Sequence, residues 1–337
     1  MTIRRTALII VLSLISFSLA ATGAKESSPS RNISVTTIGI SQLVSHPALD
    51  SIAQGIEDYL AEKKLPVEVE LQNASGEIST AAAIARKFKM DGKDIVVGIA
   101  TPTAQALANA ITTSPVVFSA VTEPISAGLV SSYAPEPGSN VTGVSDLTPV
   151  AEQIALFIRV TGARKLGMVY TSGEANGVVQ MEMAKEAAQK AGVEFISASV
   201  SNSAEVKMAT QSIIERVDAL YIAIDNTVVS AIASVSDVAK KAGKPLFNAD
   251  TTSSEGIDFL MSWGFDYYNF GTATGQVIER LINGEKPSDI GTVFLDDPTL
   301  FELWINMDVA QELGVVFPAD ILQAAKVVFQ AGEKHIK

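Results

Sequence analysis

The side chains best placed for chemistry are hydroxyl, amide and carboxylate groups at or just after the ends of predicted strands. The candidates for a binding site are Ser41, Gln42, Thr101, Ser119, Thr122, Asp146, Glu174, Asp225, Asn226 and Asp250. In open parallel sheets, ligands bind outside the carboxyl ends of the strands. Glu174, Asp225 and Asp250 follow three separate strands in the second half of the chain. Carboxylates that converge at one edge suit an ammonium group, so we expect a ligand that carries one.

Helix capping is the alternative explanation for the same residues. Ser, Thr, Asp and Asn are the preferred N-cap residues, and Pro is favoured in the first helical turn. Thr101-Pro102 fits this explanation, and capping alone accounts for about half of the candidates. The two roles are compatible, because a helix N-terminus presents free N–H groups and a partial positive charge that suit a carboxylate ligand.

Most of the motifs and residue types typical of enzyme active sites are missing from the sequence. It contains no cysteine and two distant histidines, His46 and His335, which indicates neither a metal site nor a Ser-His-Asp set. His46-Pro47 is better explained as the start of a helix. The glycine motifs of phosphate-binding loops and nucleophile elbows are absent as well. We therefore expect no enzymatic activity, no cofactor and no metal, although a pair of carboxylates for glycoside cleavage remains an alternative.

The elements that must position these residues alternate between strand and helix. The chain has 337 residues, 47% of them hydrophobic, which excludes a disordered chain and allows about two domains. The pattern predicts strands at 33–40, 65–71, 94–100, 116–121, 165–170, 193–200, 219–224, 245–247 and 301–306. It predicts helices at 47–62, 79–90, 103–111, 150–160, 176–191, 204–216, 227–241 and 268–283, with two short ones later. Such alternation is typical of parallel sheets covered on both faces.

Two such units follow one another, because the alternation restarts after Asn140. The stretch from Tyr133 to Gly138 contains two prolines and a glycine, and it is predicted to be the first crossing between two lobes. The segment from Tyr268 onward is too short for a third domain. We expect it to complete the sheets of the first two.

The N-terminus predicts export. Arg4 and Arg5 precede an apolar run at 7–20, and the small-residue exits at 18–20 and 22–24 complete the pattern of a signal peptide over 1–24. An uncleaved anchor is the alternative, disfavoured because the run is shorter than the ~20 residues of a membrane span. Without cysteine the chain can carry no lipid anchor, so we expect a periplasmic protein. Its net charge of −12 disfavours nucleic acid as a partner.

Seven stretches, in order, carry a resemblance to a known family. They are His46 to Asp50, Gln72 to Gly76, Gly98 to Gln105, Val117 to Pro124, Asn140 to Asp146, Asp225 to Val228, and Asp266 to Tyr268. Between about Ser34 and about Pro318 the chain resembles the substrate-binding proteins of ABC transporters, of the tryptophan/tyrosine type. The chain departs from the family at two places. Glu123 stands where the family often has Asp, and Gly256-Ile257-Asp258 and Trp263 stand where the family often has residues similar to Gly-Ala-Leu.

The resemblance implies a type I periplasmic-binding fold, with two Rossmann-like lobes joined by three crossings and the ligand between them. The N-terminal lobe would comprise 33–146 and about 269–302, and the C-terminal lobe 147–268 and about 303–335. It also implies an amino acid ligand, often aromatic, an ABC permease as partner, and a monomer. On this basis Thr101, with Ser119 or Thr122, would hold the ligand carboxylate, and Asp225, with Glu174, would hold the ammonium.

Two other functions stay open at this point. An exported sensory module would have the same fold, and a two-carboxylate hydrolase would use the same lobes. Phe118, Phe247 and Trp263 are candidates for an apolar wall of the ligand pocket, with core packing as the preferred interpretation.

Overall fold

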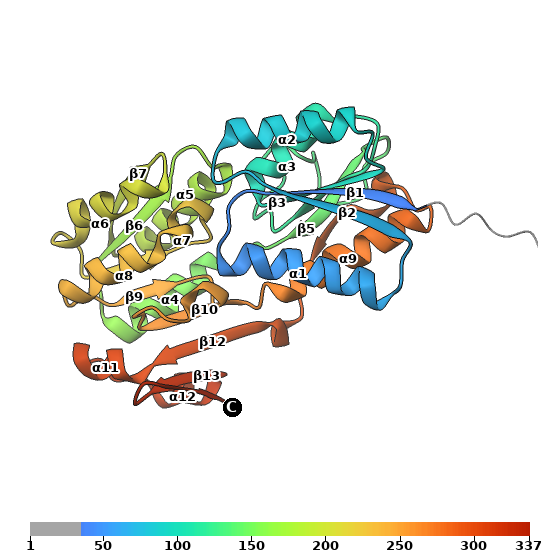
Figure 1. Ribbon diagram of the computed structural model, residues 1–337. Coiled ribbons are helices and arrows are strands. Elements are labelled where there is room, and N and C mark those ends of the chain that lie inside the picture. Colours follow the sequence, from blue (N-terminus) through green and yellow to red (C-terminus); the bar gives the residue numbers. More distant parts are fainter. Residues whose placement is uncertain (1–34) are drawn as a thin grey trace, which may run out of the picture. The chain divides into compact units, whose positions relative to one another are not determined.

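A computed structural model describes residues 35–337, and its strands form two separate sheets with helices packed against them (Figure 1). The first sheet has the strand order β11-β5-β4-β3-β1-β2, and all of its pairings are parallel. Its strands are β1 (Thr36–Gln42), β2 (Val67–Asn73), β3 (Ile95–Ile99), β4 (Val116–Ser119), β5 (Val141–Ser145) and β11 (Thr292–Phe294). Its helices are α1 (Pro47–Glu62), α2 (Ile78–Met90), α3 (Thr101–Ala110), α9 (Tyr268–Ile282) and α10 (Pro287–Ile290). These elements form the N-terminal lobe.

The second sheet has the order β14-β13-β12-β10-β9-β8-β6-β7 and is parallel except at the pairs β10–β12 and β13–β14. Its strands are β6 (Lys165–Thr171), β7 (Glu194–Val200), β8 (Ala219–Ile222), β9 (Leu246–Asn248), β10 (Met261–Phe265), β12 (Phe301–Asn306), β13 (Val327–Gln330) and β14 (Glu333–Ile336). Its helices are α4 (Val150–Thr161), α5 (Ala175–Lys190), α6 (Val206–Ile214), α7 (Asn226–Ser230), α8 (Ile232–Lys241), α11 (Met307–Leu313) and α12 (Ala319–Ala324). The short 3₁₀ helices are η1 (Ser203–Glu205), η2 (Thr252–Ser254) and η3 (Pro298–Leu300). Together they form the C-terminal lobe, so the predicted two-lobed α/β fold is confirmed.

The chain passes between the sheets three times: from β5 to α4, from β10 to α9, and from β11 to β12. The prediction of a first crossing at Tyr133–Gly138 is wrong. β5 follows this stretch and still pairs with β4, and the carbonyl oxygen of Tyr133 accepts a hydrogen bond from the Thr292 amide. The prolines therefore mark a loop within the N-terminal lobe, and the first crossing begins after Ser145.

Several elements differ from the sequence prediction. The strands β5, β10, β11, β13 and β14 were not predicted, whereas α1 and β12 have the predicted bounds. The predicted helix at 227–241 is interrupted at Ala231, whose backbone leaves the helical region, and so forms α7 and α8. The segment after Tyr268 completes both sheets as expected, since β11 extends the first sheet and β12 to β14 extend the second.

A close contact within the N-terminal lobe joins the backbones of α1 and α9. A Cβ atom on Gly271 would lie 2.3 Å from the carbonyl oxygen of Ile52, and one on Gly55 would lie 2.5 Å from that of Tyr268. Only glycine permits this approach. Because α9 starts directly after the second crossing, the contact ties α1 to the hinge.

Within residues 35–337, none of the helices has the length and apolar character needed to cross a membrane. The predicted signal peptide at 1–24 lies outside the described residues.

Candidate functional site

A small cavity of about 10 Å³ lies between the two lobes and gathers four of the predicted site residues. The C-terminal lobe contributes Asp225, Asn226 and Asp250, and the N-terminal lobe contributes His46, Ala48 and Leu49. Asp146 in the first crossing and Tyr267 in the second also line it. The cavity therefore touches both lobes and two of the three crossings.

Asp146 and Asp250 line the cavity together with Tyr267 of the second crossing, and each accepts few hydrogen bonds from the protein. The hydroxyl of Tyr267 donates to Asp146 Oδ2 at 3.0 Å, while Asp146 Oδ1 has no hydrogen-bond partner in the part of the chain that is described. Asp250 Oδ1 accepts from the Ser253 amide at 3.0 Å. Burial raises the pKa of Asp146 to about 6 and that of Asp250 to about 6, and the charge of Asp146 adds to the effect on Asp250. Because burial disfavours the ionised form of both groups, a positive charge bound beside them would stabilise their carboxylates.

Asp225 is held differently, by donors of its own lobe. It is the N-cap residue of α7, and its Oδ1 accepts from the Val228 amide at 3.1 Å. Thr171 at the end of β6 donates twice more, from its amide to Oδ2 and from its hydroxyl to Oδ1, both at 2.6 Å. Burial, followed by the charge of Glu174, raises the pKa of Asp225 to about 7. The capping explanation thus describes Asp225, although the residue also lines the cavity.

Glu174 and Asn226 form a buried network beside Asp225. Glu174 Oε2 accepts from Asn226 Nδ2 at 2.7 Å, and Glu174 Oε1 accepts from the hydroxyl of Thr227 at 2.6 Å and from its amide at 3.1 Å. Glu174 precedes α5, and Thr227 lies in the first turn of α7. The network therefore joins the starts of two helices in the C-terminal lobe.

Two of the predicted site residues in the N-terminal lobe have buried hydroxyls without partners. Ser41 lies on β1 and Thr101 begins α3 directly after β3, and these strands are neighbours in the sheet. Their side chains are 0% and 1% exposed, and neither hydroxyl has a hydrogen-bond partner within residues 35–337. Buried polar groups are normally hydrogen-bonded, so two free hydroxyls at one sheet edge indicate a place for a polar ligand.

The remaining predicted residues of this lobe have structural partners. Gln42 Nε2 donates to Asp50 Oδ1 at 2.6 Å and to the Val44 carbonyl at 2.9 Å. The Ser119 and Thr274 hydroxyls share a hydrogen bond of 2.6 Å, which ties β4 to α9. Thr122 is buried, and its carbonyl accepts from the hydroxyl of Ser145 at 3.0 Å. Of these three residues, none is among those that line the interlobe cavity within the described chain.

His46 and Tyr267 line the cavity but were not predicted to bind ligand. His46 was interpreted as a helix start, which is correct, since it is the N-cap residue of α1. The residue is only 7% exposed, and burial lowers its pKa to about 4 despite the attraction of Asp50, so its ring is neutral at pH 7. Tyr267 lies in the stretch from Asp266 to Tyr268, which carries part of the family resemblance. That resemblance was the one feature of the sequence that could have indicated a role for Tyr267 in the site.

The aromatic candidates lie elsewhere. Phe118 and Phe247 are fully buried, and the ring of Phe247 stacks on that of Tyr221 with centroids 5.3 Å apart. Their interpretation as core residues is confirmed. Trp263 lines a separate apolar cavity of about 380 Å³ near the third crossing, together with Phe301.

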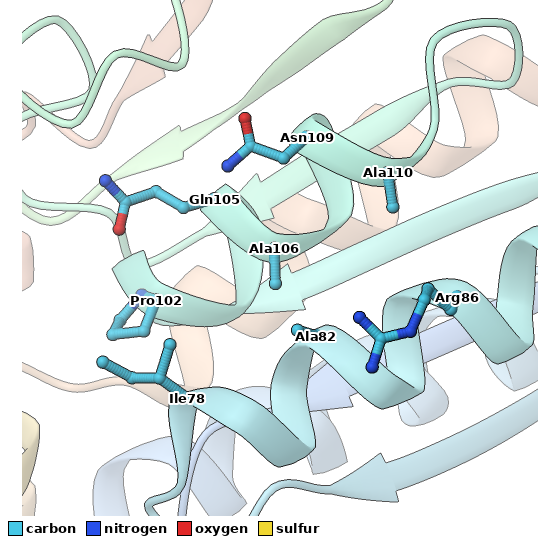
Figure 2. A pocket seen from close by; sticks show the side chains of 8 residues that line it. All are labelled: Ile78, Ala82, Arg86, Pro102, Gln105, Ala106, Asn109 and Ala110. Atoms are coloured by element: carbon cyan, nitrogen blue, oxygen red, sulfur yellow. The ribbon is translucent and has the colours of Figure 1, made fainter.

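A larger cavity, of about 500 Å³, lies on the N-terminal lobe alone (Figure 2). Its lining comes entirely from α2 and α3, and Figure 2 shows alanines between the two helices with Arg86 as the charged side chain. It brings together no pair of ionisable groups from the described residues, and it touches no crossing. We therefore place the functional site at the interlobe cavity.

Comparison with known proteins identifies the family of this chain. Residues 37–329 match the model of the family described as ABC transporter substrate binding protein. The tyrosine-binding protein of Clostridioides difficile (strain R20291) is 35% identical over 281 residues, covering 82% of this chain and 80% of that protein.

Two solved structures are similar to this chain along most of its length. One is the ABC domain in complex with L-Trp from Streptococcus pneumonia, which is 36% identical, with a TM-score of 0.83, over 88% of this chain and all of that one. The other is a ligand-free, open substrate binding protein with adhesive properties from Clostridium difficile, which is 33% identical, with a TM-score of 0.63, over 85% of this chain and 97% of that one. The fold is that of the type I periplasmic binding proteins. Since the family match covers most of the sequence and these relatives exceed 30% identity, the chain belongs to the ABC transporter substrate binding proteins.

Proposed function

We propose that this protein binds a free amino acid, of the aromatic class, between its lobes and delivers it to an ABC permease from the periplasm. The observation that carries the proposal is a set of buried polar atoms without hydrogen-bond partners. Within residues 35–337, Asp146 Oδ1 and both ring nitrogens of His46 belong to residues that line the interlobe cavity, and Ser41 Oγ and Thr101 Oγ1 lie at the carboxyl ends of β1 and β3. Each such atom costs about 1–3 kcal/mol when it stays unsatisfied, so a ligand that satisfies several of them gains binding energy.

The arrangement suits the two charges of a zwitterion. The hydroxyls of Ser41 and Thr101 and the first turn of α3 offer donors to the ligand carboxylate. The carboxylates at the hinge and in the C-terminal lobe offer acceptors to the ammonium. Because the two ends are gripped by different lobes, only the closed form makes both sets of contacts, and the ligand shifts the protein toward closure.

The geometry corresponds to a closed arrangement. A cavity of about 10 Å³ has room for about one water molecule. An amino acid therefore needs the lobes to lie further apart than in this structure, both to enter and to be held between them. The better fit of this chain to the tryptophan-bound structure than to the ligand-free open one, at similar sequence identity, supports the same interpretation.

The aromatic class rests on the relatives, whose names and titles state tyrosine and L-Trp as their ligands. The test is calorimetry with the twenty amino acids, on protein refolded from denaturant to remove any co-purified ligand. We expect tight binding of one or more aromatic amino acids. The absence of binding by any amino acid, together with turnover of a glycoside, would favour the hydrolase alternative.

A second experiment tests the grip on the carboxylate. Thr101→Val keeps the shape of the side chain and removes its hydroxyl, so amino acid affinity should fall about tenfold or more. Thr272→Val, at a half-buried position of α9 that does not line the cavity, is the matched control and should bind normally. Unchanged affinity in Thr101→Val would contradict the proposed carboxylate site.

A further inference from the structure

The two ends of the interlobe cavity differ in how well their carboxylates are satisfied. A carboxylate has acceptor positions for about four hydrogen bonds. Asp225 receives three from Thr171 and Val228. Asp146 receives one well-formed hydrogen bond from Tyr267, at Oδ2, with the Thr122 side chain nearby, and the Ser253 amide donates to one oxygen of Asp250. The unused acceptor capacity therefore lies at the hinge end.

No positive side chain balances these carboxylates. Within the described chain, neither lysine nor arginine is among the residues that line the cavity, and His46 is neutral at pH 7. Asp146 and Asp250 are each 1% exposed. Two buried carboxylates without a counter-ion are costly to ionise, and a cation between them removes that cost.

A second observation points independently to an occupant. His46 is 7% exposed and lines the same cavity from the opposite lobe; Asn226 lies near its ring, but neither ring nitrogen makes a well-formed hydrogen bond within residues 35–337. Ser253, whose amide binds Asp250, has a buried hydroxyl near the same carboxylate that likewise makes no well-formed hydrogen bond within the described residues. Polar atoms from both lobes are thus left for a polar ligand at this end.

We propose that Asp146 and Asp250, with Tyr267 orienting Asp146, select the protonated amine of the ligand, and that Asp225 positions α7 instead of contacting that amine. The inference rests on the proposed function, because it concerns the same cavity. It replaces Asp225 and Glu174, the residues expected from the sequence to hold the ammonium. It also states a substrate requirement: the ligand carries a free, protonated amino group.

The proposal predicts how affinity depends on pH. Ligand-free Asp146 and Asp250 have raised pKa values of about 6, so near pH 5 each carboxyl holds a proton that an incoming ammonium must displace. Affinity therefore rises as pH increases from 5 to 7.5. The neighbouring groups are His46, which stays neutral; Tyr267, which stays protonated because its pKa is raised; and Asp225, which titrates near 7. Because Asp225 titrates in the same pH range, the pH dependence alone does not distinguish it from Asp146 and Asp250, and substitution of each residue in turn is needed.

The experiment compares amino acids with analogues that lack only the amino group. The probes are L-tryptophan against indole-3-propionate, and L-tyrosine against 3-(4-hydroxyphenyl)propionate, measured by calorimetry at pH 7.5 and pH 5.5. We expect wild type to prefer the amino acid by about a hundredfold or more, since each charged hydrogen bond contributes about ten- to a hundredfold. Asp146→Asn and Asp250→Asn should each reduce this preference at least tenfold and flatten its pH dependence. Asp225→Asn should keep the preference.

The outcomes separate this inference from the proposed function. If no amino acid binds wild type, the proposed function fails. If an amino acid binds but its analogue binds equally well, the amine requirement alone fails. This outcome is measured on the wild-type protein and so does not depend on the folding of any variant. A preference that survives in both Asp146→Asn and Asp250→Asn, or that disappears only in Asp225→Asn, overturns the assignment. A requirement for a divalent cation, seen as loss of binding in chelator, overturns it as well.

Discussion

Replacing Asp146 by asparagine should make the ligand-free protein more stable at neutral pH, although it damages the site. The wild-type carboxylate is buried, and one of its oxygens has no partner within residues 35–337. Asparagine has the same shape and keeps an oxygen for the Tyr267 hydroxyl, and it brings no charge into the cavity. The stability gain and the binding loss come from the same atom.

The magnitude follows from the raised pKa. A carboxyl group whose pKa rises from 3.8 to about 6 on folding is disfavoured as a carboxylate by about 3 kcal/mol. The stability associated with the neutral acid is complete below pH 4 and is lost as pH rises through 6. The difference in free energy of unfolding between Asp146→Asn and wild type should therefore grow by about 2–3 kcal/mol between pH 4 and pH 7.5.

Urea unfolding of ligand-free protein at both pH values measures this difference. Asp94→Asn is a control of opposite sign, because the Thr37 amide and hydroxyl both donate to Asp94 Oδ2 at 2.7 Å and lower its pKa. That variant should lose about 1 kcal/mol at pH 7.5, with a smaller loss at pH 4. A gap between Asp146→Asn and wild type that stays constant from pH 4 to 7.5 would refute the reasoning.

Two further predictions concern packing and capping. Gly271→Ala should lose about 1–3 kcal/mol of stability in thermal unfolding, because its Cβ would lie 2.3 Å from the Ile52 carbonyl oxygen, whereas Gly173→Ala, with open space around it, should be nearly neutral. Equal stability of the two alanine variants would contradict the close contact of α1 and α9. Thr171→Val removes one donor to Asp225 and should cost about 1–3 kcal/mol in urea unfolding while keeping the preference for a free amine. Loss of that preference would argue for a direct contact between Asp225 and the ligand.

Local signals in the sequence were sufficient for the elements that carry them. α1 begins at Pro47, where proline suits the first helical turn, and its buried residues recur at helical spacing, so its bounds matched. β11 has three residues and is a strand because it pairs with β5, about 150 positions earlier in the chain. Nothing within such a short segment distinguishes it from a loop. Long-range pairing of this kind leaves no periodicity to find.

The candidate site shows the same division between local and distant information. The sequence predicted that Asp146, Asp225 and Asp250 follow strands and approach one ligand. It did not distinguish a carboxylate already engaged by its own lobe from one left free. That distinction depends on Thr171, which is 54 positions away from Asp225 and whose amide and hydroxyl take up both of its oxygens. His46 was missed because a helix start explains it fully from the sequence, whereas its burial against the opposite lobe depends on tertiary structure.

The hydrogen bond between Tyr267 and Asp146 joins two of the three crossings directly. When two lobes rotate about the segments that connect them, residues in those segments move little and residues far from them move more. A carboxylate anchored there keeps its place throughout the movement, while Ser41 and Thr101, outside the crossings on the N-terminal lobe, are displaced further. On the proposed assignment we therefore expect the ammonium group of the ligand to bind first beside the crossings, and its carboxylate to be bound when the lobes close.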